Sequence, residues 1–370
     1  MDCMKQALSL ARLALGQVSP NPAVGALIVN NGELVGQGYT QPPGLPHAEA
    51  EALKQAGERA RGGVMYVTME PCCHYGRTPP CTGAIIDAGI SEVHLAMLDP
   101  DPRVSGRGKK GLEEKGIKTY VGEYEEEAEQ INEAYIKFIT TGVPFVTAKF
   151  AVSLDGKIAT KSGDSRWISS EVARKRVHSL RYTTDAIMTG VNTVLIDNPE
   201  LTARSCGGRG GTVRAHPLRI IVDSKGRTPL TARVLSAPGK TLLVLARLAQ
   251  SKEREAFARA DAKLLELPSE GGRVDLGKLL KVLGEQEITS VLVEGGGILL
   301  GSLFDGGLVD KVVVFVAPII IGGEEAKTAV GGEGVDKVAD SLRLEQVCVE
   351  RLGDDVMVSG YVSAQPQKQG

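Results

Sequence analysis

The stretch Glu70-Pro71-Cys72-Cys73-His74-Tyr75-Gly76-Arg77-Thr78-Pro79-Pro80-Cys81 holds three of the six cysteines in the chain. It follows a β-branched segment at residues 64–69, which predicts a strand, and it leads into a helical pattern at residues 81–88. Clustered cysteines in a long cytosolic chain point to metal binding or catalysis. We expect Cys72 and Cys81 at helix N-termini, where the dipole favours thiolates, and Cys73 pointing elsewhere.

A histidine and a glutamate stand upstream in Pro46-His47-Ala48-Glu49, where Pro46 predicts the first turn of a helix. One imidazole and two thiolates are three protein ligands that leave zinc a fourth position for water, and zinc lowers the pKa of that water to about 7. Glu49, two residues past His47, is free to move the proton of that water. This order of residues is typical of zinc nucleobase deaminases, although their cysteines usually follow a shorter C-x-x-C spacing.

Other interpretations of these residues remain open at this point. His47 could be a capping histidine and the cysteines small core residues. A zinc-stabilised binding protein without activity is a second alternative, but a purely structural site has no need of Glu49. A nucleic-acid deaminase with a passive second domain is a third, and the net charge of −2 argues against it.

Hydrophobic periodicity in the first 140 residues alternates between helix and strand. Asn31-Gly32 marks a hairpin turn. Strands are predicted at residues 23–30, 33–38, 64–69, 92–98 and 117–121. Helices are predicted at residues 2–15, 46–57, 81–88 and 123–140. One hairpin followed by this alternation predicts a layered α/β sheet with mostly parallel crossovers.

Thr141-Gly142-Val143-Pro144 breaks the last of these helices, and we place a domain boundary there. Strands are predicted in the second half at residues 145–151, 185–189, 218–223, 241–246, 290–294 and 311–316. Helices are predicted there at residues 169–181, 275–283 and 297–304. The expected domains are residues 1–143 and 144–363, with a polar, disordered tail at 364–370.

Composition excludes several classes of protein. The chain has 370 residues, 42% apolar and 24% charged, which is typical of a soluble globular protein. The longest apolar stretch, residues 312–321, contains Pro318 and is shorter than the roughly 20 residues that a membrane span needs. The first 15 residues lack the pattern of a secretion signal. We therefore expect a cytoplasmic protein that binds neither membrane nor nucleic acid.

Three motifs of the first half, Pro20-Asn21-Pro22-x-Val24-Gly25, Pro46-His47-Ala48-Glu49 and the stretch Glu70 to Cys81, resemble the deaminase half of the bifunctional riboflavin-biosynthesis deaminase–reductases. The resemblance implies a cytidine-deaminase-like three-layer α/β/α domain in which His47, Cys72 and Cys81 bind Zn²⁺ and Glu49 is the catalytic proton shuttle. It implies that the pyrimidine or its ribose phosphate is contacted by Asn21, His74, Arg77 and Asp99. Thr40 departs from the family, in which a substrate-binding histidine usually follows Gly-Tyr.

Residues of the second half carry a weaker signal by themselves. Glu294-Gly295-Gly296-Gly297 joins a strand to a helix and could be a phosphate-binding turn or a plain tight turn. Ser153-Leu154-Asp155-Gly156-Lys157 is typical of a hairpin turn, and Trp167 would ordinarily be a core residue.

The same motifs nevertheless follow the order of the family's reductase half. The series is Ala148-Lys149-Phe150-Ala151, Ser153 to Lys157, Ser165-Arg166-Trp167-Ile168, Gly190 to Val194, Asp197-Asn198-Pro199-x-Leu201-Thr202-x-Arg204, Asp223-Ser224 and Glu294-Gly295-Gly296. The resemblance implies a dihydrofolate-reductase-like α/β domain that binds NADPH. It implies cofactor contacts from Ala151, Trp167, Thr193, Asp197, Ser224, Gly296, Gly297, Ile298, Leu299, Leu300, Gly301 and Ser302. It implies substrate contacts from Ser165, Leu201, Arg204 and Glu294, and Lys149 would polarise the ring-opened sugar.

Together the two halves imply two successive reactions on phosphorylated ribosylaminopyrimidines. The first is zinc-hydroxide deamination of 2,5-diamino-6-ribosylamino-4(3H)-pyrimidinone 5′-phosphate. The second is NADPH-dependent reduction of the ribosyl group to ribityl. Arg204 suits the substrate phosphate, because a guanidinium binds two phosphate oxygens at once. We also expect a homo-oligomer.

Overall fold

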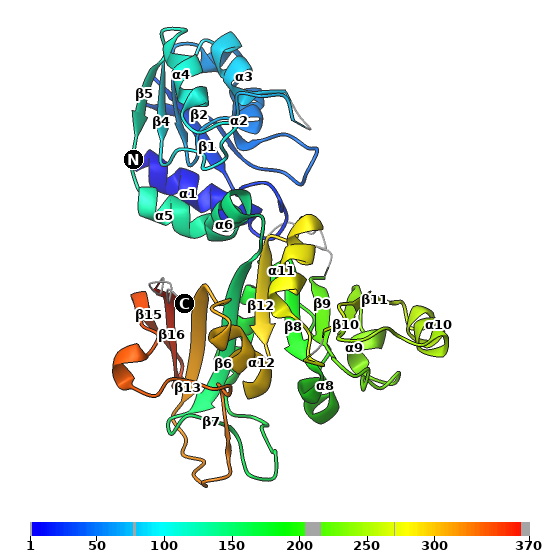
Figure 1. Ribbon diagram of the computed structural model, residues 1–370. Helices are drawn as coiled ribbons and strands as arrows, with labels where there is room; N and C mark the ends of the chain where they lie inside the picture. The colour runs from blue at the N-terminus through cyan, green and yellow to red at the C-terminus, as the bar shows by residue number, and fades with distance from the viewer. Residues whose placement is uncertain (1, 77–78, 204–215, 270, 364–370) are drawn as a thin grey trace. The chain divides into compact units, whose positions relative to one another are not determined.

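The computed structural model describes residues 2–76, 79–203, 216–269 and 271–363. The chain forms two compact units, Met1–Val143 and Pro144–Gly370 (Figure 1). Arg77, Arg204, the loop at residues 206–211 and the tail at 364–370 lie outside the described residues.

The first unit is a mixed sheet with helices on both faces. Its described strands are β1 (Gly25–Asn30), β2 (Glu33–Tyr39), β3 (Val64–Val67), β4 (Glu92–Leu95) and β5 (Lys118–Val121), in the order β2-β1-β3-β4-β5. Its described helices are α1 (Cys3–Ala14), α2 (Ala48–Ala56), α3 (Cys81–Asp87), α4 (Arg107–Glu113), α5 (Glu125–Ile131) and α6 (Glu133–Thr141). The predicted hairpin joins β1 to β2, and the predicted parallel pairing is found from β3 to β5.

Glycines of the hairpin show how closely the layers pack. A Cβ on Gly25 would lie 2.0 Å from the Ala7 carbonyl oxygen of α1. A Cβ on Gly36 would lie 2.2 Å from the Ala52 carbonyl oxygen of α2. Gly36 is paired with Ile28, which points to the opposite face from Gly25 because neighbours at odd separation alternate along a strand. α1 and α2 therefore cover opposite faces, as a three-layer α/β/α domain requires.

The prediction of a single helix near the end of this unit was wrong. The acidic segment at residues 123–140 is not one helix but two, α5 and α6, which meet at Asn132. The buried Asn132 side chain accepts a hydrogen bond from the Ala23 N–H at 2.8 Å and donates one to the Ala23 carbonyl at 3.1 Å. That contact with another part of the chain accompanies the break. The sequence also gave no prediction of α4.

The second unit is built on a larger, mostly parallel sheet. Its described strands are β6 (Phe145–Ser153), β7 (Lys157–Ala159), β8 (Ala186–Gly190), β9 (Leu218–Val222), β10 (Thr241–Leu245), β11 (Ala262–Glu266), β12 (Ser290–Glu294), β13 (Lys311–Ala317), β14 (Lys327–Thr328), β15 (Leu344–Leu352) and β16 (Asp355–Val362). Its described helices are α7 (Glu171–Tyr182), α8 (Val191–Asp197), α9 (Arg233–Ser236), α10 (Ser251–Arg259), α11 (Leu276–Glu285) and α12 (Gly297–Asp305).

Within the described ranges the main sheet runs β11-β10-β9-β8-β12-β6-β13-β16-β15. Pairs from β11 to β13 are parallel, whereas β16 pairs antiparallel with both β13 and β15. The turn predicted at residues 153–157 joins β6 to β7, but β7 pairs with β14 rather than with β6. The hairpin β15–β16 and strand β11 were not predicted. Every helix in the described part of the chain is too short or too polar to cross a bilayer.

Candidate functional sites

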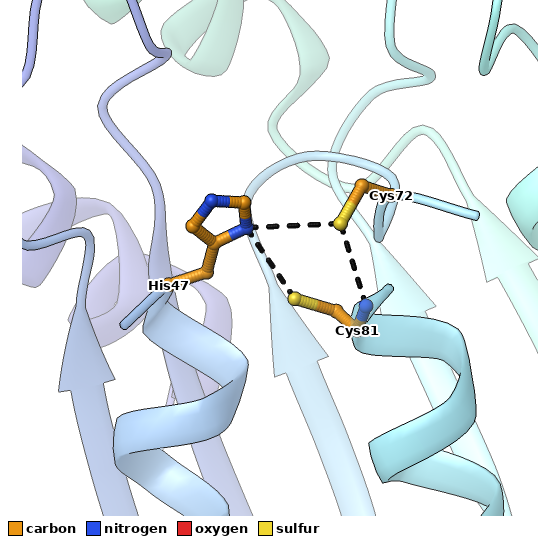
Figure 2. A group of neighbouring side chains, drawn as sticks. All are labelled: His47, Cys72 and Cys81. Atoms are coloured by element: carbon orange, nitrogen blue, oxygen red, sulfur yellow. Dashed lines mark hydrogen bonds between the residues drawn. The ribbon is translucent and has the colours of Figure 1, made fainter. Parts of the chain in front are cut away.

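His47 stands immediately before α2, at the N-cap position. Pro46 therefore precedes the helix, and the first helical residue is Ala48, not Pro46 as predicted. The His47 side chain makes no capping hydrogen bond. Its Nδ1 instead lies 3.7 Å from Cys72 Sγ and 3.4 Å from Cys81 Sγ (Figure 2). The capping interpretation of His47 is therefore wrong.

The two cysteines reach the imidazole from different kinds of backbone. Cys81 is the first residue of α3, as predicted. Cys72 lies in the non-helical segment between β3 and α3, so the prediction that it begins a helix was wrong. Its sulfur still meets a helix N-terminus, because the Cys81 N–H donates to Cys72 Sγ at 3.3 Å (Figure 2). The neighbouring Cys73 contacts the Arg103 carbonyl at 3.8 Å and stays outside the group.

The three ligand atoms fit the dimensions of a tetrahedral zinc site. They all lie within 4.8 Å of one another. Zinc binds sulfur at roughly 2.3 Å and nitrogen at roughly 2.0–2.1 Å, so tetrahedral angles would separate nitrogen from sulfur by roughly 3.6 Å. The two distances in the structure, 3.7 and 3.4 Å, bracket that value. Cys72 and Cys81 are free thiols rather than a disulfide.

Hydrogen bonding between the two cysteines and His47 favours one thiolate in the group. The hydrogen bond with Cys81, followed by that with His47, lowers the pKa of Cys72 to about 4 against the effect of burial. The same bond to Cys72 raises the pKa of Cys81, and a hydrogen bond to Cys72 raises the pKa of His47. A thiolate beside a second thiol and an imidazole is the donor set that a divalent cation stabilises.

Glu49 lies on the first turn of α2 and is 4% exposed. Burial raises the pKa of Glu49 to about 7, and the nearby Cys72 adds to the rise. A carboxyl group with a pKa near neutrality can both accept and donate a proton at physiological pH. Glu49 therefore has the protonation behaviour of a general acid–base beside the cation site.

The three described residues that were predicted to contact the pyrimidine or its ribose phosphate lie in different environments. Asp99 is buried, accepts hydrogen bonds from the Asp101 N–H at 2.9 Å and the Tyr135 hydroxyl at 3.0 Å, and has its pKa raised by burial to about 6. His74 is half-buried, and its Nδ1 is a buried nitrogen without a hydrogen-bond partner. Asn21 is half-buried in the loop before β1.

Thr40 replaces the substrate-binding histidine expected from the resemblance. It is 3% exposed, and its hydroxyl accepts a hydrogen bond from the Val24 N–H at 3.2 Å. The Thr40 side chain is therefore part of the interior rather than an exposed contact group.

A cleft of about 1270 Å³ in the second unit collects most of the predicted reductase residues. Those that line it are Lys149, Ala151, Ser165, Trp167, Thr193, Asp197, Leu201, Glu294 and Gly296. They come from the carboxyl ends of β6 and β12, from α8 and from the loops that follow β7 and α8. The carboxyl ends of parallel strands are where open α/β sheets bind their ligands.

Glu294 sits between two cations in this cleft. Arg181 of α7 donates to both of its oxygens, at 2.5 and 2.9 Å, and Lys149 Nζ lies 3.6 Å away. Burial alone would raise the pKa of Glu294, but Arg181 and Lys149 outweigh it and lower the pKa to about 2. Burial lowers the pKa of Lys149, and Glu294 opposes that change. Lys149 is thus a buried amine held against a carboxylate.

This arrangement predicts an acid-sensitive second unit. Because the folded pKa of Glu294 lies below its ordinary value of 4.5, its stabilising effect is complete above pH 4.5 and disappears as pH falls towards about 2. The difference in pKa corresponds to about 3 kcal/mol. Denaturant unfolding of the wild type and of Glu294→Gln from pH 6 to pH 2 should show the gap in unfolding free energy closing with acid. A constant gap would contradict the assigned ion pair.

Trp167 lies at the edge of the cleft and not in the core. Its side chain is 71% exposed, and the Arg174 guanidinium stacks over its ring at 4.6 Å. Nearby, the Ser165 hydroxyl donates to Asp197 at 3.1 Å. An exposed indole backed by a cation leaves one ring face available to a planar group.

The cofactor contacts implied at residues 296–302, which form the start of α12, are only partly open to the cleft. Gly296 lines it, whereas Leu299 and Leu300 are buried in the core. A Cβ on Gly301 would lie 2.3 Å from the Gly331 carbonyl carbon, so the chain itself covers that side of α12. Ile298 is 63% exposed, Gly297 accepts a backbone hydrogen bond from Gly331, and the Ser302 hydroxyl donates to the Ile298 carbonyl.

Ser224 does not line the cleft among the described residues. It follows β9, and its hydroxyl accepts a hydrogen bond from the Val274 N–H at 3.3 Å.

Sequence reasoning missed three residues of these sites: Arg181, Arg174 and Tyr135. Arg174 and Arg181 lie seven residues apart on α7, with His178 between them. Arg174, His178 and Arg181 all line the cleft. Basic side chains at helical spacing were the signal that could have found them. Tyr135 had no such signal, because only the fold brings α6 to Asp99.

Two family models match the chain. Residues 1–97 match the cytidine and deoxycytidylate deaminase zinc-binding region, and residues 144–358 match the RibD C-terminal domain. The first match contains His47, Glu49, Cys72 and Cys81, and the second contains the cleft. The fold class expected from the sequence is confirmed: a cytidine-deaminase-like α/β/α domain followed by a dihydrofolate-reductase-like domain.

Similar proteins cover nearly the whole chain. The riboflavin biosynthesis protein RibD of Aquifex aeolicus is 43% identical over 96% of this chain and 96% of its own length. A crystal form of Acinetobacter baumannii RibD matches with a TM-score of 0.88 and 36% identity, covering 98% of each chain. A Thermotoga maritima diaminohydroxyphosphoribosylaminopyrimidine deaminase/5-amino-6-(5-phosphoribosylamino)uracil reductase matches with a TM-score of 0.85 and 34% identity, again covering 98% of each. This chain therefore belongs to the RibD family of riboflavin biosynthesis proteins.

Proposed function

We propose that the chain is a bifunctional enzyme of riboflavin biosynthesis whose two units catalyse successive reactions. The first unit removes the amino group of 2,5-diamino-6-ribosylamino-4(3H)-pyrimidinone 5′-phosphate by hydrolysis. The second unit reduces the ribosyl group of the product to ribityl. The observation that carries this proposal is the convergence of His47, Cys72 and Cys81 beside the buried Glu49, in a chain that also holds the reductase cleft.

In the deaminase unit, His47, Cys72 and Cys81 would hold Zn²⁺. The bound metal supplies Lewis acidity that makes water a nucleophile at neutral pH. Glu49 would take one proton from the attacking water and pass it to the ring nitrogen, and would then move the remaining hydroxyl proton to the amine, which leaves as ammonia while the carbonyl forms. This role fits its pKa of about 7. Asn21, His74, Arg77 and Asp99 would position the pyrimidine and its ribose phosphate.

In the reductase unit, NADPH supplies the hydride for the sugar carbon C1′. Within the cleft we place the cofactor along Ala151, Trp167, Thr193, Asp197 and the start of α12, and Ser224 would contact it only outside the cleft lining. Ser165, Leu201, Arg204 and Glu294 would hold the ribosyl substrate. Lys149, whose Nζ lies 3.6 Å from Glu294, would polarise the ring-opened sugar.

Removing zinc separates the two activities. We expect prolonged chelation followed by desalting to abolish ammonia release, because the deaminase has no other means of activating water. NADPH oxidation with the deaminated ribosyl intermediate should persist, since the reductase cleft contains no metal ligand in this proposal. Re-addition of Zn²⁺ should restore ammonia release. Ammonia release that survives complete removal of zinc, or the absence of both reactions in the wild type, would refute the proposed function.

Two further expectations are part of this proposal. The five described cysteines are free thiols, which supports a reducing, cytoplasmic setting.

Val347 and Val349 are more than half exposed on the edge strand β15, which supports association with a second copy of the chain.

A further inference from the structure

Glu70 is a buried carboxylate of the cysteine motif that the proposed mechanism does not use. It is 3% exposed and stands two residues before Cys72. Its Oε2 accepts hydrogen bonds from the Asp99 N–H at 3.2 Å and the Gly106 N–H at 2.8 Å. Its Oε1 accepts from the Lys109 N–H at 2.9 Å. One carboxylate therefore holds three backbone donors, none of them in its own segment.

Two of these donors belong to the start of α4. Gly106 is the N-cap of α4, adopts φ +82°, and has no side chain with which to cap the helix. Lys109 is the third residue of α4, where an N–H has no partner within the helix. Glu70 supplies the missing acceptor and places a negative charge at the positive end of the helix dipole. The start of α4 is thus fixed by the segment that carries Cys72.

Pro71, the residue after Glu70 in the cysteine motif, contacts α4. A Cβ on Gly108 would lie 2.2 Å from the Pro71 carbonyl oxygen and 3.1 Å from Glu70 Oε1. Glycine at position 108 is what allows this approach. The backbone leading to Cys72 is therefore held on α4 by the Glu70 side chain and by the contact of Pro71 with Gly108.

The third donor, the Asp99 N–H, belongs to a residue that is expected to contact the pyrimidine. Asp99 presents its N–H to Glu70, while its carboxylate is held by the Asp101 N–H and the Tyr135 hydroxyl. Glu70 thus fixes the backbone at Asp99 as well as the backbone two residues before a cation ligand.

We propose that Glu70 is a positioning residue that sets Cys72 and Asp99 relative to each other, so that the cation site and the pyrimidine site are built as one unit. This inference rests on the proposed deaminase function for the role of Asp99. Glu70 is not a member of the group of His47, Cys72 and Cys81, and it acts through the backbone of Asp99 and of the residues before Cys72. Outer groups that orient metal ligands commonly change metal affinity or activity 10–100-fold when they are altered.

Glu70→Gln is the direct test, because glutamine keeps the size of the side chain. One of its two oxygen acceptors becomes an NH2 donor, which would face backbone N–H groups that are themselves donors. We expect the zinc dissociation constant, measured by competition with a chelating dye, to rise at least tenfold. At saturating zinc we expect KM for the pyrimidine to rise at least tenfold, with a smaller change in kcat because Glu49 is intact. NADPH oxidation in the second unit should stay at the wild-type rate.

Glu113→Gln is the matched control. Glu113 is an acid on α4, the helix that Glu70 caps, and its hydrogen bonds with Lys109 Nζ and the Thr119 hydroxyl are exposed. It should leave zinc affinity and KM unchanged. A Glu70→Gln protein that unfolds more easily but keeps wild-type zinc affinity and KM would overturn the inference. If Glu70→Gln does not fold, Glu70→Asp takes its place, with the same two outcomes. Should the wild type release no ammonia, the proposed function fails, while the comparison of zinc affinities still decides the role of Glu70.

Discussion

Glu49→Gln is expected to keep its zinc and to release ammonia ~10³-fold more slowly than the wild type, since a positioned general acid–base contributes about 10²–10⁴ in rate. Glutamine has nearly the size of glutamate but cannot carry the proton between water and the pyrimidine. Because His47, Cys72 and Cys81 supply the three ligand atoms, the metal content should not change. The measurement is ammonia release together with zinc content by atomic absorption on the same sample.

Glu51→Gln provides the control for that experiment. Glu51 lies on the same helix, α2, two residues beyond Glu49, and it is half-buried outside the group of ligands. It should retain both zinc and activity. If Glu49→Gln loses zinc along with activity, Glu49 is a ligand or a structural support rather than the proton shuttle. If the variant keeps wild-type activity, the assigned role is wrong.

Glu294→Gln is expected to destabilise the second unit by about 3–5 kcal/mol, the usual cost of removing one partner of a buried ion pair. The change leaves Arg181 and Lys149 as buried cations without a counter-charge. Reduction with NADPH should fall at least 100-fold at a temperature where the variant is folded, because Lys149 loses its anchor in the cleft. Denaturant unfolding and NADPH oxidation measure the two effects.

A second arginine–carboxylate pair gives the control in the same unit. Glu253 accepts hydrogen bonds from Arg247 at 2.6 and 2.9 Å, but the two side chains are 26% and 38% exposed. Partly exposed pairs contribute about 0–1 kcal/mol. Glu253 also accepts a hydrogen bond from the Gln250 N–H at the start of α10, so Glu253→Gln should cost something but clearly less than Glu294→Gln, and it should leave reduction intact. Equal losses for the two variants, or normal reduction by Glu294→Gln, would contradict the role given to the buried pair.

Local chemistry explains why the group of His47, Cys72 and Cys81 could be predicted from the sequence. His47 and Cys81 stand where a loop meets a helix, Cys72 lies in the segment between β3 and α3, and the three residue types together favour a bound cation. The hairpin at Asn31-Gly32 was predictable for a similar reason, because both residues adopt the positive φ values that such a turn requires.

Long-range contacts explain what the sequence did not reveal. The break between α5 and α6 accompanies a contact of Asn132 with Ala23, 109 residues away. Helix α4 depends on a cap from Glu70, 39 residues before Lys109. Arg181 and Glu294 are separated by 113 residues. No window of sequence contains both partners of such contacts, so local patterns could not predict them.

The proposed deaminase depends on one zinc ion bound by His47, Cys72 and Cys81, and X-ray absorption at the zinc edge of the purified full chain reads the ligands of that ion. We expect one zinc per chain with two sulfurs at roughly 2.3 Å and an imidazole nitrogen at roughly 2.0–2.1 Å. Cys72→Ser should remove one sulfur from that shell. A zinc shell without sulfur, or a disulfide between Cys72 and Cys81 in the active protein, would contradict the account.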